Sequence, residues 1–167
     1  YTDFHPRAGK RSGAWMTNYK EQWIDETGNN RPHVSVTMNF TKPTAERPAL
    51  LTMSEVETFL HEFGHAIHGL MANTKYRAMS GTSVYRDFVE LPSQIMENWA
   101  GEKEFLHTFA RHYQTGELIP DELVERMKAA QNFNVANGCI GQVRYGMLDM
   151  AWYTQTEDFN GDVEKFE

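Results

Sequence analysis

The chain has 167 residues, 40% of them hydrophobic and 23% charged, so it can bury a core and lacks the composition of a disordered chain. Its net charge of -7, spread along the sequence, argues against nucleic acid or an anionic membrane as a partner. No stretch reaches the roughly 20 apolar residues of a membrane-spanning helix. The single cysteine, Cys139, excludes an internal disulfide, and we expect it to be buried as a small apolar residue.

Both ends of the sequence predict a piece of a longer protein. The chain begins with Tyr1 rather than methionine, and it ends at Glu167 just after a long helical pattern. No signal-peptide pattern opens the sequence, which favours a cytoplasmic protein.

The first fifty residues have the pattern of short strands and turns. Residues 14–19 follow a Ser-Gly pair, and β-branched residues alternate with period two over 34–40, so both segments are predicted strands. Residues 26–32, Glu-Thr-Gly-Asn-Asn-Arg-Pro, are predicted to form a turn or hairpin loop.

From residue 51 onward the apolar spacing is helical. Ser54, with Glu57 three residues later, predicts an N-cap and capping box for a helix over 55–71. A second helix is predicted to begin near Asp87, with Pro92 in its first turn. Further helices are predicted over 102–115, 120–130 and 141–155. The expected fold class is therefore mainly α with a small N-terminal β-sheet, with a strand and loop region over 1–50 and a helical region over 51–167.

The first predicted helix contains His61-Glu62-Phe63-Gly64-His65. Residues i and i+4 share one helix face, so both imidazoles can bind one ion, for which Zn²⁺ is the usual choice. Glu62 points about 100° round the helix, beside the metal, where it can accept a proton from a water that the metal activates. This is a metallopeptidase arrangement, but three fixed positions are too few to establish it.

A catalytic zinc site usually has a third protein ligand. The extended motif with a third histidine is excluded, because His68 and Met71 occupy the positions of its glycine and histidine. His68 itself lies about 4.5 Å beyond His65 along the axis, so we expect it at the helix surface or in a pocket. Glu90 and Glu97 remain as candidates. The helix dipole favours Glu90, and spacing also allows both to be solvated surface residues.

Three features near the motif carry further expectations. Glu57, Gln94 and Glu97 are candidates to accept the second ring N–H of a ligating histidine, with a surface or capping role as the alternative. Gly64 inside a helix suggests close approach of the helix that carries the third ligand. The strand around Trp15 could pair with an extended substrate, although core packing of Trp15 is favoured.

Residues 59–68, Phe-Leu-His-Glu-Phe-Gly-His-Ala-Ile-His, resemble the signature of the thimet oligopeptidase and peptidyl-dipeptidase family of zinc peptidases. Residues 87–94, Asp-Phe-Val-Glu-Leu-Pro-Ser-Gln, resemble the segment with that family's third zinc ligand. Blocks at 39–44 and 55–58 fit as well, and the resemblance runs from about Phe4 to Tyr153. It implies an α+β zincin-type core, one Zn²⁺ per chain held by His61, His65 and Glu90, and Glu62 as the general base.

Within this family, residues 3–7, 13–16 and 80–88 are most similar to bacterial peptidyl-dipeptidases, also called dipeptidyl carboxypeptidases. The resemblance implies release of dipeptides from the C-termini of short peptides, with an endo-acting oligopeptidase as the alternative. Enzymes of the family are several times longer, with two mostly helical lobes beside a deep channel, so residues 1–167 would be part of a catalytic domain and the remainder of the parent enzyme its partner. The family's tyrosine- and glycine-rich substrate-binding segment has no match, so a zinc-binding piece without activity of its own is a further alternative.

Overall fold

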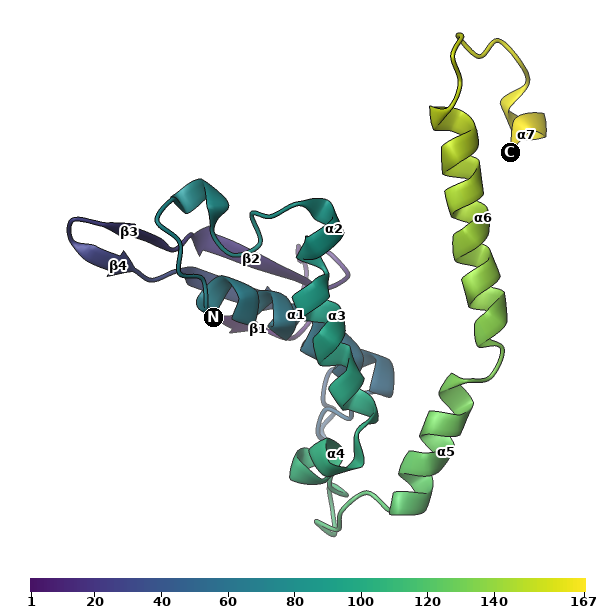
Figure 1. Ribbon diagram of the computed structural model, residues 1–167. Coiled ribbons are helices and arrows are strands. Elements are labelled where there is room, and N and C mark those ends of the chain that lie inside the picture. The colour runs from purple at the N-terminus through teal and green to yellow at the C-terminus, as the bar shows by residue number, and fades with distance from the viewer. The chain divides into compact units, whose positions relative to one another are not determined.

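The computed structural model covers residues 1–167 and divides them into two units, Tyr1–Asp121 and Glu122–Glu167. Helices predominate, and all strands lie in the first 37 residues, as the sequence predicted (Figure 1). No helix meets both the length and the hydropathy that a bilayer-spanning segment needs.

A three-stranded sheet opens the first unit. It consists of β1 (Thr2–Asp3), β5 (His33–Thr37) and β2 (Trp15–Lys20), in that spatial order. β1 runs parallel to β5 and β2 runs antiparallel to it, with Trp15 opposite Thr37. The two strands expected over 14–19 and 34–40 are thus confirmed, although the second ends at Thr37. β2 forms one edge of the sheet.

A separate hairpin pairs β3 (Trp23–Asp25) with β4 (Gly28–Asn30), where the sequence predicted a turn or hairpin loop. Gly28 has φ +118°, a backbone conformation that favours glycine. The hydroxyl of Thr27 and the indole N–H of Trp23 donate to the carboxylate of Asp25, which lowers the pKa of Asp25 to about 2. Local side-chain hydrogen bonds therefore close this turn.

Helix α1 (Met53–Leu70) packs on the sheet. Its buried Ala66 joins a core made of side chains from β5 and the segment that follows it: Val34, Val36, Met38 and Phe40. Because side chains alternate along a strand, Ala14 and Met16 of the β2 region pack against this core. Trp15 is half-buried and its ring lies under Arg11, 5.1 Å away, so the expected core packing of Trp15 is wrong.

The predicted capping box of α1 is wrong by two residues. Thr52 is the N-cap, and its side-chain oxygen accepts the N–H of Glu55 at 3.2 Å. The carboxylate of Glu55 accepts the N–H of Thr52 and that of Thr41, each at 2.7 Å. Both Thr52 and Ser54 are followed by glutamate after three residues, but only Glu55 also receives the contact from Thr41, which is distant in sequence.

The single helix expected near Asp87 is two helices, α2 (Arg86–Val89) and α3 (Leu91–Glu97). Pro92 lies in the first turn of α3, and because it lacks an N–H it cannot continue the hydrogen-bond ladder from α2. Glu90 therefore lies at the junction of the two helices and not in a first turn. The short helices η1 (Arg77–Met79) and η2 (Asn98–Gly101) precede and follow this pair.

Helix α4 (Lys103–Phe109) is shorter than the predicted helix over 102–115. A turn follows instead. In this turn Arg111 and Leu118 form an isolated antiparallel β-bridge, and the N–H of His112 donates to the carbonyl of Glu117 at 2.8 Å. This turn accounts for the early end of the helix.

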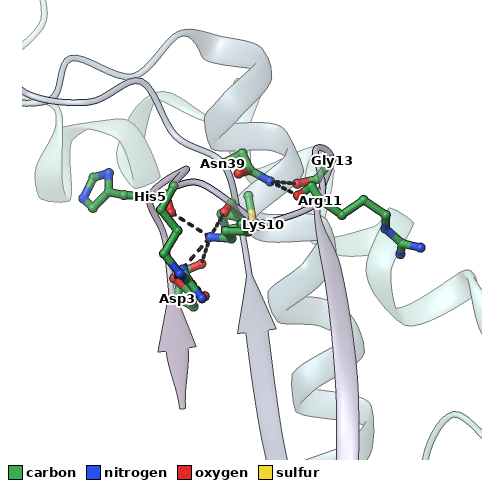
Figure 2. A network of polar contacts seen from close by, with 8 residues as sticks. Asp3, His5, Lys10, Arg11, Gly13 and Asn39 are labelled. Atoms are coloured by element: carbon green, nitrogen blue, oxygen red, sulfur yellow. Dashed lines mark hydrogen bonds and ion pairs between the residues drawn. The ribbon is translucent and has the colours of Figure 1, made fainter.

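A polar network around Lys10 ties the N-terminal segment to the sheet (Figure 2). The ammonium group of Lys10 donates to the carbonyls of Asp3 (3.0 Å), His5 (2.9 Å) and Met38 (2.5 Å). It also pairs with the carboxylate of Asp3 at 3.1 Å. Asn39 donates to the carbonyls of the loop residues Arg11 (2.9 Å) and Gly13 (2.7 Å). The loop that leads into β2 is thus held at both ends.

The second unit contains α6 (Val135–Tyr153) and α7 (Val163–Phe166), and α5 (Asp121–Gln131) begins at its boundary. α6 begins six residues before the predicted start at 141. Val124 is the only buried residue of this unit. Cys139 is exposed, which corrects the expectation that it is buried, because no other segment of the unit covers that face of α6.

Candidate metal centre

Two histidines on α1 and one carboxylate from the α2–α3 junction converge. The Nε2 atoms of His61 and His65 lie 3.2 Å and 3.1 Å from the same Oε2 of Glu90. One possible ligand atom from each residue lies within 4.8 Å of the others, a grouping that could hold a metal ion. The structure thus brings together the three residues that the sequence selected as ligands.

The surroundings of Glu90 favour its ionised form. Ser93, which is fully buried, donates its hydroxyl to the Oε2 of Glu90 at 2.8 Å. Burial opposes ionisation, but the bond from Ser93 and the proximity of His65 and His61 outweigh it, so the pKa of Glu90 lies below its ordinary value. Sequence reasoning missed Ser93, although its position three residues after Glu90 at a helix start was a usable signal.

The donor set suits zinc. Zn²⁺ in catalytic sites is bound by imidazole nitrogen and carboxylate oxygen, and two histidines with one glutamate form such a set. Burial lowers the pKa of His65, which favours the neutral imidazole that a metal requires. His61, His65 and Glu90 therefore fit a zinc ion by chemistry as well as by position.

Gly64 explains how α3 comes so close to α1. A Cβ at Gly64 would lie 2.6 Å from the Cα of Ser93 and 2.7 Å from the carbonyl oxygen of Pro92, both backbone atoms. Only glycine allows this approach without displacing a helix. The structure confirms the expectation that the helix after Glu90 packs closely against Gly64.

Glu62 is buried, with 8% of its surface exposed, and it lies outside the three-residue cluster. Burial raises the pKa of Glu62 above its ordinary value, and the nearby carboxylate of Glu90 adds to this effect. The proximity of His61 and, to a smaller extent, the backbone N–H of Met16 in β2 oppose it. Glu62 and His61 both line a hollow of about 360 Å³. The contact with Met16 was not predicted, because strand pairing decides where that N–H points.

Glu97 does not join the cluster of candidate ligands, whereas Glu90 does; the spacing of the two glutamates alone did not distinguish them. The Oε1 of Glu97 lies 2.5 Å from Nδ1 of His61, the ring nitrogen opposite the one that faces Glu90. Of the other two candidates for such a contact, Gln94 is exposed and Glu57 lines the hollow beside His61.

His68 lies outside the cluster, as expected. Its ring packs edge-on against Phe88, with centroids 6.2 Å apart, and burial lowers its pKa. Its Nδ1 is buried without a hydrogen-bond partner.

Comparison with known proteins gives a consistent picture. The sequence model of peptidase family M3 matches residues 1–166. The chain is 42% identical to dipeptidyl carboxypeptidase of Escherichia coli over 168 residues, 100% of this chain and 24% of that protein. It is 40% identical to oligopeptidase A of E. coli over 93% of this chain and 23% of the relative, and 38% identical to saccharolysin of Saccharomyces cerevisiae over 92% and 22%. The chain therefore spans about a quarter of the length of these curated relatives.

Proposed function

The chain belongs to peptidase family M3, and from this premise we propose that it forms part of the catalytic domain of a zinc peptidase acting on short peptides. The proposal covers all of residues 1–167 and assigns them a zincin-type core. The observation that carries it is the convergence of His61, His65 and Glu90, with the buried Glu62 directly after the first histidine.

In this proposal His61, His65 and Glu90 hold one Zn²⁺. When bound, zinc would lower the pKa of a water towards about 7 and polarise the scissile carbonyl. The carboxylate of Glu62 accepts a proton from the attacking water and then passes it to the leaving amine. The hydroxyl of Ser93 donates to the carboxylate of Glu90 and holds it in place.

We propose release of C-terminal dipeptides as the reaction. The relative named dipeptidyl carboxypeptidase is 42% identical to the chain and is aligned over all of it, which supports this choice. Oligopeptidase A, at 40%, keeps internal cleavage as the second candidate. A substrate blocked at its C-terminus separates the two, because an enzyme that releases C-terminal dipeptides needs the free C-terminus and an endo-acting enzyme does not.

The parent enzyme would supply what the chain lacks. Residues 1–167 contain the candidate ligands and the candidate base, but no match to the family's tyrosine- and glycine-rich segment. We therefore expect little or no turnover by the 167-residue chain, and the binding of metal is its testable property.

Metal analysis of the purified chain tests the ligand set. Wild type and Glu62→Gln should each hold about one zinc per chain, whereas Glu90→Gln should lose most of it, because one of three ligands becomes a weaker neutral donor. Full occupancy in Glu90→Gln would refute Glu90 as a ligand.

In the parent enzyme, Glu62→Gln should reduce hydrolysis of an N-blocked tripeptide by several orders of magnitude while zinc remains bound. An undiminished rate would remove Glu62 from the role of general base. Blocking the C-terminus of the same peptide should abolish its cleavage if the enzyme releases dipeptides.

A further inference from the structure

We propose that Glu97 is a positioning residue that fixes the orientation and the tautomer of His61. This inference rests on the proposed metal centre. It assigns to Glu97 an effect on the metal that passes through the imidazole ring, with no direct contact to the ion.

The contact itself sets the tautomer. Oε1 of Glu97 lies 2.5 Å from Nδ1 of His61, a short hydrogen-bond distance. An ionised carboxylate only accepts hydrogen bonds, and a neutral imidazole has one N–H and one lone pair. In a neutral ring that offers the lone pair of Nε2 to a metal, the single proton therefore lies on Nδ1, where the carboxylate of Glu97 accepts it, while Nε2 faces Glu90 at 3.2 Å.

One short helix holds this ring from both sides. Glu90 immediately precedes α3 and Glu97 ends it, so the two carboxylates reach opposite nitrogens of the same imidazole. The close approach of α3 at Gly64 fixes the distance of this helix from α1. Any shift of α3 would move both contacts of His61 together.

The second histidine has no such support. Nδ1 of His65 is buried and has no hydrogen-bond partner, although its Nε2 lies 3.1 Å from Glu90. The two imidazoles are therefore held differently, and the loss of Glu97 should alter His61 while leaving His65 in place. This asymmetry makes the effect of Glu97 measurable at a single ring.

The first measurement needs no metal. In the metal-free 167-residue chain, the ¹⁵N chemical shifts of the His61 ring should report a proton on Nδ1 in wild type. Glu97→Ala should move the proton towards Nε2, where the carboxylate of Glu90 lies 3.2 Å away, whereas Glu97→Gln should retain more of the Nδ1–H form because its amide oxygen can still accept. An unchanged tautomer in Glu97→Ala would overturn the proposal.

The second measurement is zinc affinity by competition with a chelator. Loss of an outer hydrogen-bond partner usually weakens metal binding by about 10–100-fold, so we expect a loss in this range for Glu97→Ala and a smaller one for Glu97→Gln. Glu57→Gln is the matched control, because it removes a carboxylate from the same hollow and leaves the contact at Nδ1 intact. An equal loss in Glu57→Gln and Glu97→Ala would indicate a general charge effect and refute the positioning role.

The two measurements separate this inference from the proposed function. A wild-type chain that binds no zinc would contradict the metal centre, whereas the tautomer of His61 would still decide whether Glu97 positions the ring.

Discussion

The two units of the chain use their apolar side chains differently. In the first unit, β5 and α1 bury theirs against each other around Met38 and Ala66. In the second, the 19-residue helix α6 has no buried residue, and Ile140 and Met147 are exposed. Apolar residues at three-to-four spacing predicted helices in both units. The spacing identifies a helix, but its stability in a protein comes mostly from what covers the apolar face.

The strongest test of this difference compares two methionines. Met38→Ala in the core should destabilise the chain by about 2–5 kcal/mol, because its side chain is only 2% exposed and a cavity would remain. Met147→Ala should change stability by less than about 0.5 kcal/mol, because Met147 is 69% exposed. Urea unfolding followed by circular dichroism measures both, and similar losses would contradict the contrast.

Two glycines provide the next test. Gly64→Ala should cost about 1–3 kcal/mol, because the new Cβ meets the backbone of Ser93 and Pro92. Gly146→Ala in α6 should instead stabilise the chain by up to about 1 kcal/mol, since nothing lies within 4 Å and alanine favours a helix. Thermal unfolding should therefore show a lower midpoint temperature for Gly64→Ala and a higher one for Gly146→Ala. A stabilising Gly64→Ala would mean that α3 lies further from α1.

A smaller effect should appear as a pH dependence at the start of α1. Hydrogen bonds from the backbone of Thr52 and Thr41 lower the pKa of Glu55 below its ordinary value of 4.5. A carboxyl whose pKa is lower in the folded than in the unfolded state stabilises the fold, and this contribution is complete at pH values above its unfolded pKa. The contribution is lost as the pH falls through the folded pKa. Glu55→Gln should therefore cost about 1 kcal/mol at pH 7 and progressively less below about pH 4.5. A cost independent of pH would contradict the capping assignment.

The smallest expected change concerns Cys139. Because this thiol is exposed, a thiol reagent should modify it in the native chain at nearly the rate found in denaturant. A labelling time course with and without urea makes the measurement, and strong protection in the native state would show that α6 is covered.

The candidate ligands illustrate what a sequence can predict here. The i, i+4 spacing was sufficient to place His61 and His65 on one face, because helix geometry alone determines it. It could not separate Glu90 from Glu97, since α3 carries both to the same imidazole. The decisive features are the helix break at Pro92 and the approach at Gly64, which depend on the packing of two helices.

The errors of prediction have a similar origin. Thr52 caps α1 in place of Ser54 because Thr41, eleven residues earlier, adds a contact to Glu55. The predicted burial of Cys139 assumed a covering segment that its unit does not provide. In each case a contact beyond the local pattern, or the lack of one, determines the outcome.

The network around Lys10 has a consequence for chemical labelling. Its side chain is only 3% exposed, and its ammonium group donates to three backbone carbonyls. An amine-reactive reagent can therefore acylate it only after the N-terminal segment has separated from β5, whereas Lys165, 84% exposed, remains available throughout. The ratio of acylation at these two lysines would measure how often the N-terminal segment separates from the sheet. Because this segment leads into β2, which carries Met16 near Glu62, the ratio would also report whether the candidate site is intact.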